Sequence, residues 1–65
     1  MTFGEKLRYL RMRQGLTIPE LSEASGLARS HIQYLEKDMT PPTDRARRLL
    51  EAALNLDPNE LEPDG

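Results

Sequence analysis

The sequence contains no cysteine and only one histidine, and this composition limits the kinds of metal site and cross-link that the chain can form. Without cysteine there is no disulfide and no thiolate metal site, and the redox compartment stays undetermined. His31 alone cannot form a zinc site, because zinc in proteins takes three or four side-chain ligands. We therefore predict no metal and no cofactor, and we assign His31 to packing or to a phosphate contact.

Long apolar runs are also missing, which argues against a membrane-spanning helix. Near the N-terminus, Lys6, Arg8 and Arg11 interrupt the apolar residues, so the start of the chain does not resemble a signal peptide. We expect a cytoplasmic protein that makes no membrane contact.

The 65 residues are enough for one domain, which we place at residues 1–61, with residues 62–65 as a frayed acidic tail. A chain of this length buries only about 60% of the surface that its unfolded form exposes. A preformed cavity for a small-molecule ligand is hard to build in so small a core. No nucleophile with a nearby base can be assembled from these residues, so we expect a binding protein and not an enzyme.

Charge is distributed unevenly along the chain, although the formal net charge is −2. All nine lysines and arginines lie within residues 1–48, together with six acidic residues. The last 17 residues hold the remaining five acidic residues and no base. This pattern is compatible with a basic body that faces phosphates, or simply with the ordinary charged surface of a helical protein.

Helical spacing of apolar residues and repeated helix-start signals predict an all-α fold of five short helices. The patterns Thr2-Phe3-Gly4-Glu5 and Thr17-Ile18-Pro19-Glu20 are capping boxes. Leu21 and Ala24 would form the apolar side of the second helix, and Gly26 permits a sharp turn before a third helix over residues 28–37. A fourth helix follows Thr43, and a fifth would start at Asp57-Pro58.

The third predicted helix has one apolar and one polar side. If Ile32 and Leu35 point inward at 100° per residue, the opposite face carries hydrogen-bonding side chains, with Arg29 at its leading end. Such side chains suit base edges, since arginine pairs with guanine and glutamine with adenine. The alternative is a solvated polar face of the kind that any surface helix has. The candidates for base contact are Arg29, Ser30, Gln33 and Tyr34; Tyr34 could equally cover the helix flank.

Taken together, these segments resemble the Cro and lambdoid-phage-repressor family of helix-turn-helix regulators, the XRE-type domains. The match runs from Phe3 to Leu61 through F-G-E-K-L-R-Y-L-R, G-L-T-x-x-E-L, G-L-A-R-S-H-I-Q-Y-L-E and L-N-L-D-P-N-E-L. The resemblance implies a compact lambda-repressor-like bundle whose third helix enters the major groove of double-stranded DNA. It also implies a buried structural ion pair between Arg11 and Glu36.

Contacts to the phosphate backbone are expected from several further positions. The amides near Thr17 lie at a helix start, where anions bind well. In the family, the loop before the fourth helix and that helix itself approach phosphates, whereas Arg47 is expected to extend over the edge of the core. The phosphate-contacting candidates are Thr17, Arg11, Arg13, Lys37, Thr40 and Arg45.

Three positions depart from the family pattern. Ile18 stands where a DNA-contacting glutamine is usual, and Ala28 stands where a capping serine or threonine is common. Asp38 replaces a frequent glycine and would place a negative charge near the expected phosphate path. These departures favour an alternative function, a protein-interaction module on the same fold with DNA binding weakened or lost.

The sequence as a whole predicts a sequence-specific DNA-binding transcription regulator, a repressor by default. One helix-turn-helix unit covers few base pairs, so such proteins usually bind as pairs. A homodimer could form through the last helix, around Leu56, Pro58 and Leu61, or the chain could pair with another protein.

Overall fold

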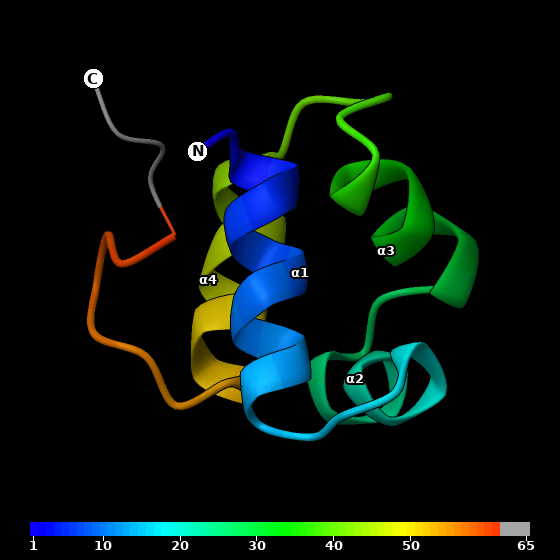
Figure 1. Cartoon of the computed structure of the whole chain (residues 1–65), viewed down its shortest axis with the longest axis vertical. Coiled ribbons are helices and arrows are strands. Elements are labelled where there is room, and N and C mark those ends of the chain that lie inside the picture. Colours follow the sequence, from blue (N-terminus) through cyan, green and yellow to red (C-terminus); the bar gives the residue numbers. More distant parts are fainter. Residues whose placement is uncertain (62–65) are drawn as a thin grey trace.

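The structure is a computed structural model and describes residues 1–61, which contain four α-helices (Figure 1). They are α1 (Phe3–Arg13), α2 (Ile18–Ser25), α3 (Arg29–Glu36) and α4 (Asp44–Ala53). The predicted all-helical fold is confirmed over these residues. The tail expected at residues 62–65 lies outside the described residues.

Threonine side chains determine where α1, α2 and α4 begin. In both predicted capping boxes the hydroxyl of the threonine accepts from the amide of the glutamate three residues later, and the glutamate carboxylate accepts from the threonine amide. Thr43 caps α4 by accepting from the amide of Ala46 at 3.0 Å. Helix α3 starts after Ala28 without any side-chain cap, so its position depends on contacts with other elements.

The turn between α2 and α3 is formed by Gly26 and two serines. Gly26 has a φ of +80°, a left-handed conformation that glycine adopts at little cost, and its amide donates to the Ser22 carbonyl. The Ser22 hydroxyl donates to the Leu27 carbonyl, and the Leu27 amide donates to Ser25 Oγ at 3.2 Å. Ala24, expected in the core, is exposed, and Ser25 is buried in its place.

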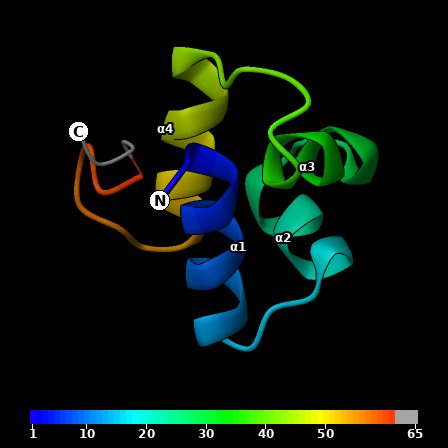
Figure 2. The same cartoon turned by 45° about the horizontal axis from the view of Figure 1, so that its top comes forward.

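Helices α1 and α4 stand next to each other in both views, with α2 and α3 on the far side of α1 from the C-terminal segment (Figures 1 and 2). The Gln14 side chain, just after α1, joins the first two by donating from Nε2 to the Leu54 carbonyl at 2.6 Å. The helices enclose one apolar core. Its fully buried members are Leu7, Leu21, Ile32, Leu35, Leu50, Leu54 and Leu61.

The fifth helix predicted after Asp57 is not present; residues 58–61 form a turn. Asn59 has a φ of +70°, which is incompatible with a right-handed helix, and its amide donates to the Glu51 carboxylate at 2.9 Å. The predicted dimer seam therefore changes as well. Leu61 is fully buried in its own chain and cannot line a surface, whereas Leu56 is half-buried and Pro58 exposed.

Candidate nucleic-acid interface

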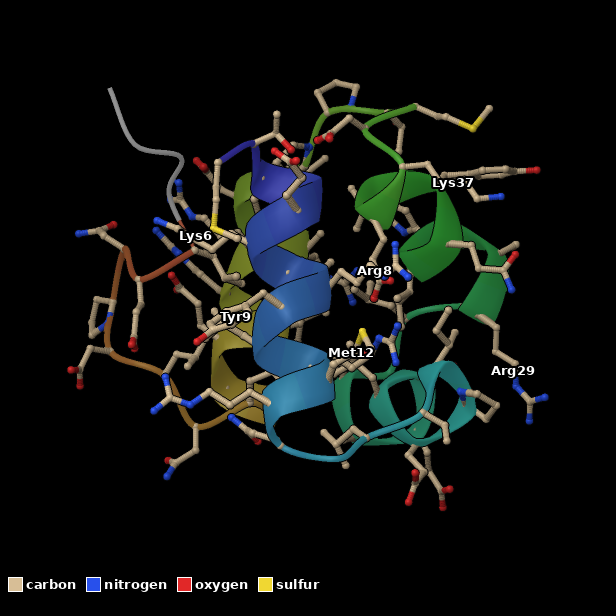
Figure 3. All side chains as sticks on the ribbon, in the orientation of Figure 1. Lys6, Arg8, Tyr9, Met12, Arg29 and Lys37 are labelled. Carbon is tan, nitrogen blue, oxygen red and sulfur yellow. The ribbon has the colours of Figure 1, made fainter. Side chains whose placement is uncertain are left out.

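Helix α3 has its apolar side in the core and its polar side in solvent. Ile32 and Leu35 are fully buried, and Tyr34 keeps 49% of its surface exposed. Figure 3 shows Arg29 reaching away from the body at one end of α3, with Lys37 at the other end. Lys37, at the C-terminal cap of α3, is exposed. The four candidates for base contact are exposed on the helix itself: Arg29, Ser30, Gln33 and Tyr34.

An ion pair ties the C-terminal part of α3 to α1. Arg11 Nε lies 2.7 Å from Glu36 Oε2 and Arg11 Nη2 lies 3.1 Å from Glu36 Oε1, so both carboxylate oxygens are engaged. The two side chains keep only 12% and 7% of their surface exposed. The hydrogen bond to Glu36 raises the pKa of Arg11 above its ordinary value. Arg11 Nη1 also donates to the Leu16 carbonyl at 2.8 Å, which links the pair to the connector before α2.

Asp38 makes a second connection between the two helices. Its φ is +57°, and its carboxylate accepts from the Gly4 amide at 2.9 Å and from the Thr2 hydroxyl at 2.6 Å. The acidic group thus binds the N-terminus of α1, where a negative charge is favourable. The sequence did not indicate this contact, because 34 residues separate Asp38 from Gly4.

A shallow groove of about 300 Å³ lies beside α3, between it, α1 and the start of α2. Three cationic side chains and one carboxylate are among its lining residues, so the groove has a net positive charge. Figure 3 shows Arg8 extending from α1 toward α3. The lining residues are Arg8, Arg11, Ile18, Gln33, Glu36 and Lys37.

Arg8 was not among the residues predicted from the sequence, although a signal for it exists. It precedes Arg11 by three residues, so the two lie on neighbouring positions of one helix face. Because Arg11 contacts α3, Arg8 must lie near α3 too.

The remaining phosphate candidates lie at separate places. Arg13 is exposed at the end of α1, Thr40 is half-buried in the connection to α4, and Arg45 is exposed in the first turn of α4. The Thr17 hydroxyl already accepts from the Glu20 amide at 3.2 Å. His31 is half-buried on α3.

No group of side chains within residues 1–61 is arranged to hold a metal ion. Over the same residues, none of the helices combines the length and the apolar character that crossing a bilayer requires.

Helices α2 and α3, joined by a turn with a left-handed glycine, define a helix-turn-helix domain. The second of these helices is buried on one side and polar on the other, and a cationic groove lies beside it. The helix-turn-helix family HTH_3 matches residues 7–61. The chain belongs to this family of XRE-type, DNA-binding transcription regulators.

A solved structure supports the same assignment. The restriction-modification controller protein C.AhdI from Aeromonas hydrophila is 36% identical in sequence and superposes with a TM-score of 0.87. The similarity covers 91% of this chain and 89% of that one. A comparison with curated proteins gave no match.

Proposed function

We propose that this protein is a sequence-specific transcription regulator that inserts α3 into the major groove of DNA and represses by occupying its operator. One observation carries the proposal: Ile32 and Leu35 are fully buried, while the hydrogen-bonding side chains of α3 face solvent. A helix held in this way is a rigid probe with the width that the major groove admits. The similarity to a restriction-modification controller supports a regulatory role.

In this proposal Arg29 and Gln33 discriminate between bases. The guanidinium of Arg29 would donate to guanine O6 and N7, and the amide of Gln33 would pair with adenine N6 and N7. Ser30 and Tyr34 supply further hydrogen bonds on the same face. Of the six residues predicted to contact phosphates, Arg13, Lys37, Thr40 and Arg45 would do so in this proposal. The other two, Arg11 and Thr17, already hydrogen-bond within the chain.

Two copies would bind two half-sites, because a single recognition helix reads too few base pairs for useful specificity. With Leu61 buried inside its own chain, the exposed surface around Leu56 and Pro58 is what remains of the predicted seam.

A protein-interaction module on the same fold is the second candidate function. The net charge of −2 favours it, and so does Ile18 at a position where a DNA-contacting glutamine is usual. The two functions differ in their response to salt. DNA binding weakens steeply as salt rises, because each neutralised phosphate releases counterions.

The proposal is tested by selecting duplexes from a random pool at two salt concentrations. The wild type should enrich one motif, and Arg29→Ala or Gln33→Ala should relax the preference at one position each, at a cost of about 1–3 kcal/mol on the preferred site. Arg48→Ala removes an equal charge from the exposed surface of α4 and serves as the control. If both variants select the wild-type motif, these residues do not read bases.

A further inference from the structure

The start of α2, where DNA phosphates were expected to bind, has little hydrogen-bonding capacity left. The Thr17 amide donates to Glu20 Oε1 at 2.9 Å, and the Glu20 amide donates to Thr17 Oγ1 at 3.2 Å. Pro19 has no amide hydrogen, so only the amide of Ile18 remains in the first turn. The carboxylate of Glu20 also adds a negative charge there. A phosphate would bind better elsewhere on this face.

The groove beside α3 has the opposite character. Within residues 1–61, neither Arg8 nor Lys37 has an acidic partner, and both are exposed. Arg11 lies between α1 and α3 with its guanidinium already bound to Glu36 and to the Leu16 carbonyl. It therefore contributes to a fixed floor for the groove, while Arg8 and Lys37 remain available for a ligand.

The groove also brings cationic side chains from two helices to the edge of one space. Its volume of about 300 Å³ is open to solvent, and Arg8 comes from α1 whereas Lys37 caps the end of α3. Gln33 lines the groove as well as belonging to the outward face of α3. A phosphate bound here would lie directly beside a base contacted by α3, as the backbone does along the edge of the major groove.

We propose that this groove binds one phosphate of the DNA backbone between Arg8 and Lys37, so that α1 and not the start of α2 provides the main phosphate contact. The inference rests on the proposed function, since it assumes that this face meets DNA. Arg8 thereby acts as a positioning residue that sets the depth and register of α3 in the groove of the duplex.

The test compares the salt dependence of binding for Arg8→Ala, Lys37→Ala and the double variant on the wild-type motif. Each neutralised phosphate contributes about 0.9 to the slope of log Kobs against log salt. If the two residues share one phosphate, the double variant should lower the slope by about one in total and leave base preference unchanged. Thr17 carries no charge and cannot change the slope, so its contribution is compared as affinity: at low salt, Thr17→Ala should weaken binding less than Arg8→Ala does. Arg48→Ala is the matched control for loss of one charge.

Duplexes carrying a neutral methylphosphonate at one backbone position at a time locate the contact. The wild type should weaken at each contacted position, and at one of these positions Arg8→Ala and Lys37→Ala should both cause no further loss. The inference is overturned if the two variants lose their effect at different positions, or if both behave like Arg48→Ala. If the wild type binds no duplex at low salt, it is the proposed function that fails.

Discussion

Single side chains hold α3 in place at both of its ends. Before its first turn, the hydroxyl of Ser22 donates to the Leu27 carbonyl and so fixes the chain that enters the helix. At the other end, Glu36 pairs with Arg11, and Asp38 accepts hydrogen bonds from the start of α1. These contacts pair none of the first amides of α3, which has no side-chain cap, but they fix where the helix lies.

Glu36→Ala should lower the free energy of unfolding by about 3 kcal/mol, because it leaves the largely buried guanidinium of Arg11 without its counter-ion. Urea titration measures this change. Glu23→Ala removes an exposed carboxylate from α2 and is the control, expected to fall within about 0.5 kcal/mol of the wild type. Equal midpoints for the two variants would show that the pair contributes nothing to stability.

Gly4 illustrates a residue whose role only the structure reveals. A methyl group at this position would lie 2.5 Å from the Leu35 carbonyl oxygen and 2.6 Å from that of Glu36. The absence of a side chain is what lets α1 approach the end of α3 so closely. In the sequence, Gly4 is only the third residue of a capping box, and that pattern accepts any residue there.

Local sequence determines where most of the helices begin. Each capping box satisfies two amides with side chains no more than three residues away, so no distant contact is needed. In each box the threonine amide donates a hydrogen bond to the glutamate carboxylate, and this bond lowers the pKa of Glu5 and Glu20 below the ordinary value of 4.5.

These lowered pKa values predict how stability responds to acid. Between the folded and unfolded pKa of each glutamate, the native state binds fewer protons than the unfolded state, so stability rises with pH. The stabilisation is complete above the unfolded value and is lost as pH falls through the folded one. Glu5→Gln and Glu20→Gln should each flatten the curve of melting temperature against pH below 4.5, and the double variant should flatten it further. Curves that stay parallel to that of the wild type would contradict this account.

The segment after Asp57 carries the same start signals as the capped helices and yet forms a turn. The Asp57 amide donates to Glu60 Oε2 at 2.8 Å, as in a capping box. Eight residues back, however, the buried carboxylate of Glu51 accepts from the Asn59 amide, and Asn59 adopts a left-handed conformation. A contact with α4 thus overrides the local signal, which is why the sequence predicted a helix that does not form.

On the scale of the whole molecule, the C-terminal turn closes the core. Leu61 is fully buried together with the leucines of α1, α2 and α4, so its side chain belongs to the fold of one chain. Leu61 therefore contributes to the folding of a single chain and not to an association of two copies, which would have to use exposed surface.

Leu61→Ala should therefore destabilise the folded chain by about 2–5 kcal/mol, through lost burial and the cavity that remains. Thermal melting at two protein concentrations tenfold apart checks where the loss arises. The decrease in melting temperature should be the same at both concentrations. A decrease that disappears at the higher concentration would place Leu61 in an interface between copies instead.

The sequence by itself determined the all-helical class, the starts of α1, α2 and α4, the glycine turn and the outward polar face of α3. All of these depend on contacts within a few residues or on the 3.6-residue period of a helix. The tertiary structure alone decided that Asp38 binds the start of α1, that Leu61 is buried and that Arg8 and Lys37 flank one groove. Those features join residues far apart in the chain, and their geometry is fixed only when the helices pack together.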